Sequence, residues 1–343
     1  FAKFAVNGAD AESALQRICA NDVGGAPGRA IYTQWLNERG GIEADLTVTR
    51  LVEDSYMVVT AAATATRDLH WLKRHIPGDA RVSVVDITAG YAVLGVMGPN
   101  SRALLSGLTG ADLSNPAFPF GASREIEIGY ARVCASRISY MGELGWELYI
   151  PSEHAVAVFD RIVEAGGAHG LKLCGMHAMD SLRIEKAYRH WGHDIGEEDT
   201  PIEAGLSFVV AFDKKLPFIG RDALLKQKNQ PRLTKRMVQF ALEDPQPLLY
   251  HNEPIYRDGK LVGHTTSANY GHTLGRAIAM AYVTCPDGVD QAYIESGRFE
   301  IEVACEPHPS VDALTKILNN VRDPDREAEE LIEAYHDIEE IRI

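Results

Sequence analysis

The chain contains 343 residues, more than one ordinary hydrophobic core accommodates, so two or three domains are expected. Hydrophobic residues make up 45% of the chain and charged residues 24%, which is typical of a soluble globular protein. No apolar run approaches the roughly 20 residues that a membrane-spanning helix needs. The formal net charge of −14 argues against non-specific nucleic-acid binding, which depends on dense Lys and Arg. We therefore expect neither a membrane nor a nucleic acid as a partner.

The cysteines and the first residues bear on the compartment. The five cysteines are odd in number, widely scattered and free of any C-x-x-C pair, which suits a reducing compartment. We expect the cytoplasm, or the mitochondrial matrix in a eukaryote. The chain opens without Met, a basic region or an apolar stretch, so no secretory signal is indicated. It begins as though within a domain, which suggests a fragment whose N-terminal partner is missing.

The N-terminal part of the chain mixes helical and strand patterns. Asp10 precedes residues 11–19, whose apolar side chains recur at helical spacing, so a capped amphipathic helix is expected there. Residues 47–51 and 56–60 are β-type runs separated by a polar turn, and they predict a hairpin. A short helix is expected over residues 67–75.

The middle of the chain continues this mixture. Val-rich runs end at Gly-Pro or Gly-containing turns, and two stretches carry apolar residues at helical spacing. Strands are expected over residues 81–87, 91–97, 131–140 and 146–150, and helices over residues 154–164 and 176–186.

The C-terminal part has a different character. Residues 237–283 carry Arg257-Asp-Gly-Lys260 between β-type runs, a hairpin signal, and predict a small β-barrel or sheet domain. The polar segment 231–236 marks the boundary before it. Residues 323–343 are acidic with apolar side chains at helical spacing, and they predict an amphipathic C-terminal helix.

Several standard signatures are absent. The sequence contains no G-x-G-x-x-G after a strand, no P-loop, no H-E-x-x-H and no G-x-S-x-G, so the chain does not bind a dinucleotide by itself in the usual way. Cys174-x-x-His177 and His190-x-x-His193 each supply only two potential metal ligands, whereas zinc needs three or four. Packing or surface roles are favoured for all four residues, and no metal is expected. A nucleophilic pair of Cys174 and His177 has equally little support.

Two carboxylates lie where binding or catalysis would need them. If Glu147 continues a strand after the Gly145 bend, it alternates with apolar Trp146 and Leu148 and points to the opposite side. There it can accept two hydrogen bonds from an amino-pyrimidine edge, the edge that a pterin ring offers. The structural alternative is a solvent-facing Glu on an edge strand, and the pattern alone favours it.

Asp45 follows the turn around Gly40-Gly41, where polar residues give way to Leu46 and Val48. A desolvated carboxylate at one end of a strand can orient or polarise a nucleophilic amine. The structural alternative is an Asp that caps the glycine turn.

Four segments resemble, in order, the folate-binding aminomethyltransferase family of the glycine cleavage T-protein. They are NERGGIEADLTVTR, RISYMGELGWELYIP, SLRIEKAYRHWGHDIGEEDTPIEAGL and FIGRDALL. The later stretch from LLYHNEPIYRDGKLVG to AIAMAYV is similar to the C-terminal barrel of that family. The GELGWELY and YRHWG versions most resemble the C-terminal folate module of sarcosine and dimethylglycine dehydrogenases.

The resemblance implies an α+β, multi-domain fold in which mixed α/β subdomains surround a central cavity and a β-barrel follows. Residues 1–230 would form the folate-binding region as two interleaved α+β subdomains, and residues 235–306 the barrel. Residues 307–343 depart from the family and would be an atypical acidic tail.

The resemblance also implies site residues. Asp45 matches the acidic residue near the reacting folate nitrogens, Glu147 the carboxylate that binds the pterin edge, and Tyr140 the aromatic side chain that lines the folate pocket. Two positions depart from the T-protein: Thr60 stands where it has an Asn beside the pterin, and Met179 where it has an Arg for the glutamate tail. Cofactor binding at these positions would use Thr60, with Arg183 or Arg276 as candidate cations for the tail.

The activity implied is capture of the formaldehyde or iminium from oxidative N-demethylation of sarcosine or dimethylglycine, as methylene-tetrahydrofolate. FAD would bind only on a missing N-terminal domain, so a flavin domain in cis or in trans is the expected partner. Holding both folate nitrogens near the one-carbon unit makes a dilute bimolecular step local. The alternatives are a free-standing folate-dependent aminomethyltransferase or demethylase and a non-catalytic regulatory homologue.

Overall fold

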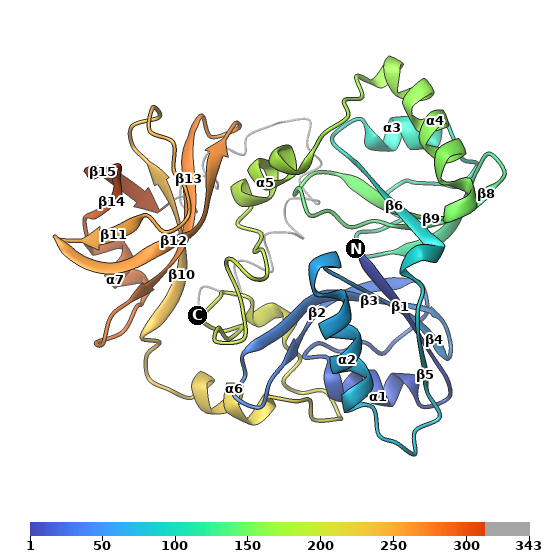
Figure 1. The fold of residues 1–343 in the computed structure, drawn as a ribbon, viewed down its shortest axis with the longest axis horizontal. Coiled ribbons are helices and arrows are strands. Elements are labelled where there is room, and N and C mark those ends of the chain that lie inside the picture. The colour runs from blue at the N-terminus through green and yellow to red at the C-terminus, as the bar shows by residue number, and fades with distance from the viewer. Residues whose placement is uncertain (313–343) are drawn as a thin grey trace. The chain divides into compact units, whose positions relative to one another are not determined.

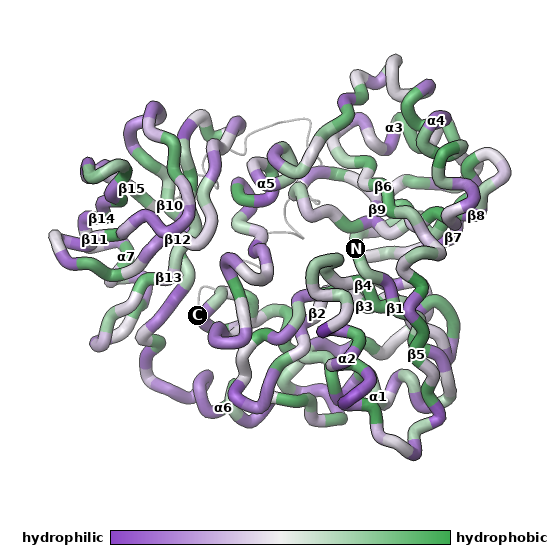
Figure 2. Tube along the Cα trace, viewed as in Figure 1, coloured by the Kyte–Doolittle hydropathy of each residue, from purple (hydrophilic) through white to green (hydrophobic). Residues whose placement is uncertain are grey.

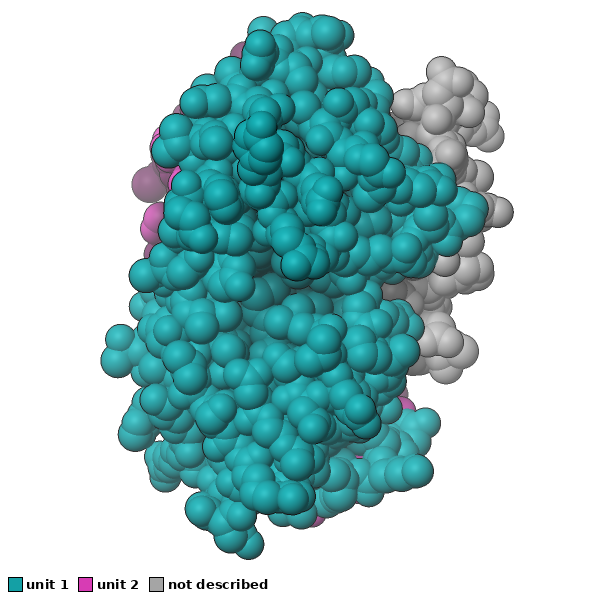
Figure 3. All heavy atoms as spheres, turned by 90° about the vertical axis from the view of Figure 1, so that its right-hand side faces the viewer, with its two compact units in different colours: residues 1–36, 43–174, 209–219 teal, residues 37–42, 175–208, 220–343 magenta. Residues whose placement is uncertain are grey.

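The computed structural model describes residues 1–312. The chain divides into two compact units. Unit 1 consists of residues 1–36, 43–174 and 209–219, and unit 2 of residues 37–42, 175–208 and 220–343. Figure 3 shows the surface of unit 1 in teal. The division differs from the expected one, because residues 37–42, 175–208 and 220–230 group with the barrel and not with the rest of residues 1–230.

The first sheet of unit 1 is five-stranded, with strand order β2-β3-β4-β1-β5 (Figure 1). Its strands are β1 (Ala2–Asn7), β2 (Arg29–Leu36), β3 (Ile42–Val52), β4 (Ser55–Thr60) and β5 (Ser83–Asp86), and its helices are α1 (Ala11–Ile18) and α2 (Ala65–His75). One face of the sheet forms a core with the helices, in which Phe4, Trp35 and Val58 pack with Leu15 and Leu72. The expected hairpin is confirmed, since β3 and β4 pair antiparallel.

Helix α1 is confirmed and ends one residue before the expected end, but the prediction that Asp10 caps it is wrong. The Asp10 side chain makes no capping bond to the helix. Its carboxylate instead accepts hydrogen bonds from the backbone N–H and the guanidinium of Arg81 at 2.9 Å. These contacts hold the pKa of Asp10 down at about 2, chiefly through the side-chain bond.

The second sheet of unit 1 has strand order β6-β9-β8-β7. Its strands are β6 (Tyr91–Met97), β7 (Ser123–Ile128), β8 (Ala131–Ser136) and β9 (Gly145–Pro151), and its helices are α3 (Ser101–Ser106) and α4 (Ala155–Gly166). Trp146, Leu148 and Ile150 of β9 pack with Phe118 and Ile162 in one core. The expected strand over 131–140 ends at Ser136, four residues early.

The two sheets of unit 1 pack against each other. Met57 and Val59 of β4 form a small apolar cluster with Tyr149 of β9. Backbone hydrogen bonds join the sheets at their other side, from Ala30 N to Gly121 O and from Ser123 N to Gly28 O, each 2.8 Å. The tube in Figure 2 shows hydrophobic stretches in β1 and β4. Each sheet therefore has one face in its own helical core and one face directed at the other sheet.

Unit 2 contains a closed barrel of six strands in the described part of the chain, in the order β10-β13-β12-β11-β14-β15. Its strands are β10 (Lys235–Leu242), β11 (Pro254–Arg257), β12 (Lys260–Gly271), β13 (Arg276–Thr284), β14 (Phe299–Val303) and β15 (Glu306–Asp312), and its helices are α5 (Met176–Glu185), α6 (Arg221–Lys228) and α7 (Gln291–Ser296). Phe240, Ile255 and Ile301 are fully buried inside the barrel. Helix α5 packs on β12, and the Ser181 hydroxyl donates to Tyr270 O at 2.7 Å.

Two expectations about the barrel are resolved. The hairpin signal is confirmed, because Asp258 and Gly259 take the positive φ values of 51° and 76° that a primed turn needs. The expected barrel end at residue 306 is wrong, because β15 pairs with both β14 and β10 and closes the barrel. The expected helix over residues 323–343 lies outside the described residues. Among residues 1–312, no helix is long and apolar enough to cross a membrane.

Candidate functional site

Strand alternation directs Asp45 at the second sheet of unit 1. Leu46 of β3 belongs to the helical core of the first sheet, so Asp45, its neighbour along the strand, points to the opposite face. Thr47 lies on that same face and is paired directly with Val59. Val59 packs on Tyr149 of the second sheet. Asp45 therefore faces the space between the two sheets.

Two donors on the neighbouring strand hold the Asp45 carboxylate. The Tyr32 hydroxyl donates to Asp45 Oδ1 at 2.6 Å, and Gln34 Nε2 donates to the same oxygen at 2.9 Å. Gln34 is fully buried, while Asp45 is half-buried. These bonds orient the carboxylate and leave it partly open to the surroundings.

Asp45 does not cap the glycine turn, so the structural alternative for this residue is wrong. The turn is held by Asn37, whose Oδ1 accepts hydrogen bonds from Arg39 N and Gly41 N at 3.0 Å each. Asp45 lies further along, inside β3. Its carboxylate therefore has no part in the backbone geometry of the turn.

Glu147 lies on the inner face of the second sheet. Its neighbours Trp146 and Leu148 are buried in the core with α3 and α4, so Glu147 and Tyr149 point the other way, as the alternation predicts. Strand β9 lies between β6 and β8, and Glu147 is only 8% exposed. The alternative of a solvent-facing Glu on an edge strand is wrong.

The surroundings of Glu147 disfavour the charged form of its carboxyl. Burial raises the pKa of the Glu147 carboxyl, against the opposing effect of a hydrogen bond from Tyr149. The Tyr149 hydroxyl donates to Glu147 Oε2 at 2.5 Å. Burial and the Glu147 charge raise the pKa of Tyr149 well above its ordinary value, so the phenol keeps its proton and remains the donor. A buried carboxylate with one protein donor has acceptor capacity left for a ligand with N–H groups.

Tyr140 and Thr60 have different surroundings. Tyr140 is half-buried in the loop between β8 and β9, the loop that leads into the strand of Glu147. Thr60 ends β4 on the helical-core face, paired with Ala2, and its hydroxyl donates to Asp68 of α2 at 2.5 Å. The structure therefore brings Asp45 and Glu147 to facing sheets and places Tyr140 next to β9. It does not bring the Thr60 side chain to that side.

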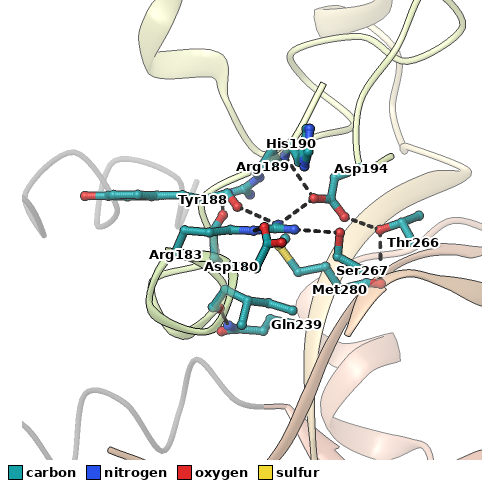
Figure 4. A network of polar contacts seen from close by, with 12 residues as sticks. Asp180, Arg183, Tyr188, Arg189, His190, Asp194, Gln239, Thr266, Ser267 and Met280 are labelled. Carbon is teal, nitrogen blue, oxygen red and sulfur yellow. Dashed lines mark hydrogen bonds and ion pairs between the residues drawn. The ribbon is translucent and has the colours of Figure 1, made fainter. Parts of the chain in front are cut away.

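Arg183 belongs to unit 2, where it is the centre of a buried polar network (Figure 4). Its guanidinium forms an ion pair with Asp194 at 2.8 Å and a longer one with Asp180 at 3.4 Å. It also donates to Tyr188 O and to the Ser267 hydroxyl, both at 3.0 Å. With these four partners, a role in binding a glutamate tail would require breaking protein contacts.

The other two positions of unit 2 singled out from the sequence, Arg276 and Met179, are half-buried. Arg276 is half-buried on β13 and donates to Leu242 O at 3.3 Å. Met179 is half-buried on α5. A polar pocket of about 190 Å³ opens beside Arg183 and is lined by His190, His193 and His251 among others.

The two metal-like fragments do not form a metal site. The His190 and His193 rings lie 4.5 Å apart, tilted by 38°. Burial lowers the pKa of His190, and the neighbouring His193 adds to this effect. Cys174 is exposed and donates weakly to Lys172 O. In residues 1–312, no group of three or more His, Cys, Asp and Glu side chains is arranged to hold a metal ion.

Three residues of this region, Tyr32, Gln34 and Tyr149, were not predicted from the sequence. The first two lie on β2, which was not predicted although Tyr32 and Gln34 alternate there with Thr33 and Trp35. Tyr149 follows Glu147 by two residues, so strand spacing alone indicates that they share a face.

Comparisons with known proteins agree with this architecture. The chain belongs to the glycine cleavage T-protein family: residues 1–214 match the GCVT N-terminal domain, and residues 235–313 match the glycine cleavage T-protein C-terminal barrel domain. The structure is similar to the glycine cleavage system aminomethyltransferase T of Bartonella henselae, with a TM-score of 0.78 at 26% identity over 91% of this chain and 82% of that one. The α+β architecture with its closed barrel is thereby confirmed.

Two curated relatives are much longer proteins. The chain is 44% identical to 4-methylaminobutanoate oxidase (formaldehyde-forming) of Paenarthrobacter nicotinovorans, over 90% of this chain and 37% of that protein. It is 37% identical to human mitochondrial sarcosine dehydrogenase, over 88% of this chain and 34% of that protein. The chain thus spans about a third of the length of these relatives.

Proposed function

We propose that this chain is the tetrahydrofolate-binding, one-carbon-transfer part of a longer N-demethylating oxidoreductase. The observation that carries the proposal is the placement of two carboxylates on facing sheets: Glu147 is buried, while Asp45 is half-buried and held by two donors. A dehydrogenase or oxidase of an N-methyl amine is favoured because both long relatives carry such names, and one name states that formaldehyde is formed.

The residues of unit 1 fit a reduced pterin. Its N–H edge needs a carboxylate that accepts two hydrogen bonds, and Glu147 is a buried acceptor of this kind. When bound, tetrahydrofolate supplies the two nitrogens that take up a one-carbon unit at the oxidation level of formaldehyde. Asp45 orients or deprotonates the attacking nitrogen through its carboxylate, and Tyr32 and Gln34 keep that carboxylate in place. Tyr140 is assigned to the wall of the pocket.

The flavin and the amine substrate belong to the rest of the proposed protein. We assign FAD to a further domain, in cis or in trans, that oxidises the amine, and this chain takes up the one-carbon product. Sarcosine, dimethylglycine and 4-methylaminobutanoate leave different amines behind, whereas the one-carbon product is common to all three. The folate part can therefore be shared among such enzymes.

A free-standing aminomethyltransferase is the second candidate. It is supported by the similarity to aminomethyltransferase T over 91% of this chain. The two candidates share folate binding and differ in the donor of the one-carbon unit. Free formaldehyde is accepted under the first, and an aminomethyl group is the donor under the second.

The test is titration of tetrahydrofolate into the purified chain by calorimetry, followed by the rate of its condensation with formaldehyde. We expect saturable binding and a rate above the uncatalysed one. Asp45→Asn should remove at least about nine-tenths of the added rate, since positioned acid–base groups contribute on the order of 10²-fold or more. The matched control is Asp54→Asn, because Asp54 is an exposed carboxylate in the turn of the same hairpin. The proposal fails if the wild-type chain does not bind, or if Asp45→Asn accelerates the reaction as well as the control.

A further inference from the structure

A single open position lies beside the buried carboxylate. Gly95 of β6 is paired directly with Glu147 of β9, and the residue is exposed although it lies in the middle of its strand. Among residues 1–312, a Cβ added at Gly95 would meet only the Met97 side chain, at 3.5 Å from Cε and 4.0 Å from Cγ. These are ordinary van der Waals distances, so the protein itself leaves room for a side chain there.

Two neighbouring positions, Gly145 and Ser136, are filled. A Cβ at Gly145, the next residue on the same face of β9, would overlap the Met97 sulfur and Val96 O. On the opposite side Glu147 is paired with Ser136, which is buried and hydrogen-bonded to the Ser123 hydroxyl at 2.9 Å. Of the two strands that flank Glu147, only β6 thus lacks a side chain at the paired position.

The fold gives no reason for a glycine at position 95. Its φ is not in the positive range that favours glycine, and no backbone atom approaches within 4 Å of the added Cβ. A glycine inside a strand costs roughly 0.5–1 kcal/mol relative to alanine, because more backbone freedom is lost on folding. An alanine would fit and stabilise the strand, so a use other than folding is indicated.

The missing side chain would stand next to the carboxylate. Side chains of directly paired residues in antiparallel strands lie roughly 4.5–5.5 Å apart at Cβ. An aromatic ring that hydrogen-bonds to a carboxylate through two N–H groups must approach it edge-on, nearly in the plane of the carboxylate. A ring that binds in this way on the β6 side of Glu147 would lie against the paired Gly95, where the absence of a side chain leaves room for its thickness.

We propose that Gly95 is the floor on which the flat pyrimidine half of a reduced pterin lies when its N–H edge binds Glu147, so that Gly95 determines which ligands the site admits. The inference rests on the proposed function and adds a specificity-determining residue to it. Gly95 has no side chain that could take part in chemistry, and it acts only by leaving space. Any larger residue at position 95 should raise stability or leave it unchanged while it weakens ligand binding.

The experiment compares Gly95→Ala and Gly95→Val with the wild-type chain. Calorimetry measures the Kd for tetrahydrofolate, and thermal unfolding without ligand measures stability. The control is Gly90→Val, because Gly90 is exposed just before the same strand and an added Cβ meets nothing within 4 Å. We expect at least a hundredfold weaker binding for Gly95→Val, a smaller loss for Gly95→Ala, and wild-type affinity for Gly90→Val.

The outcomes separate this inference from the proposed function. Binding by the wild-type chain together with equally tight binding by Gly95→Val overturns the inference and leaves the proposed function standing. No binding by the wild-type chain overturns both. If Gly95→Val unfolds, Gly95→Ala decides: weaker binding with unchanged or raised unfolding temperature supports the inference, and unchanged binding overturns it.

Discussion

Replacement of Glu147 by Gln tests the proposed ligand edge most directly. The side chain keeps its shape and one acceptor oxygen, but the second oxygen becomes an NH₂ group that meets a ligand donor. A hydrogen bond to a charged group contributes about 1.5–3 kcal/mol. Losing one such bond and making the other neutral should cost about 2–4 kcal/mol of binding free energy. At 1.4 kcal/mol per factor of ten, the Kd for tetrahydrofolate should rise about 30- to 700-fold.

The same substitution should stabilise the ligand-free protein. Burial raises the folded-state pKa of Glu147 above the unfolded value, so folding favours its protonated form. The stabilisation from this group is fully present below the unfolded pKa and is lost as the pH rises through the folded pKa. At pH 7.5 the carboxylate therefore carries a cost that Gln does not have. We expect Glu147→Gln to unfold at a higher temperature than the wild type at pH 7.5, with little difference at pH 4.

Thermal unfolding with and without tetrahydrofolate gives both quantities in one assay. The wild type should gain thermal stability from the ligand, whereas Glu147→Gln should start higher and gain little. The control is Glu127→Gln, because Glu127 is an exposed carboxylate on β7 of the same sheet. An unchanged ligand response in Glu147→Gln would refute the assignment of the ligand edge. A lower unfolding temperature without ligand would refute the account of the cost of its charge.

Three further results are expected. The affinity of the wild type for tetrahydrofolate should fall as the pH is lowered through the raised pKa of Glu147. This fall should begin at a higher pH than for an ordinary Glu of pKa 4.5. Calorimetry at several pH values measures the affinity, and an affinity that does not change with pH would contradict the prediction. Tyr32→Phe removes the 2.6 Å bond to Asp45 and should lower kcat about tenfold with little change in KM, whereas an equal rise in KM would indicate a direct ligand contact. Arg183→Met leaves Asp194 buried without its charge partner and should lower the free energy of unfolding by about 3–5 kcal/mol. Denaturant titration measures this change. Weaker ligand binding at unchanged stability would instead support the predicted role of Arg183 at the folate tail.

Much of the fold could be predicted because local pattern and tertiary burial agree in it. The hairpin of β3 and β4, helices α2, α4 and α5 and the turn at Asp258-Gly259 all follow from spacing and turn chemistry. Strand β2 was missed although Ile31, Tyr32, Thr33 and Trp35 are types that favour strands. Gln34 is fully buried there, and its Nε2 donates to Asp45, a residue of another strand. Such a compensating contact cannot be found from local sequence.

The site could be predicted only in part, because strand alternation is local whereas burial and contacts depend on distant residues. The alternation around Glu147 correctly indicated its face, but its burial depends on β6 and β8, which flank β9. Arg183 was predicted as a cation for the glutamate tail because it lies near Met179 in the sequence. Its partners Asp194 and Ser267, however, lie 11 and 84 residues away along the chain. The sequence therefore shows that a charged residue is present, but it does not show that structural contacts already occupy its side chain.

The hydrophobic pattern and the site geometry in unit 1 depend on each other. Asp45 lies between core residues of β3, and Glu147 lies between core residues of β9. A slip of one residue in either strand would bury the carboxylate in a helical core and turn apolar side chains toward the other sheet. The free energy that buries Leu46, Trp146 and Leu148 therefore also holds both carboxylates on facing sheets. Substitutions that loosen these cores should impair ligand binding even though the substituted residues contact no ligand.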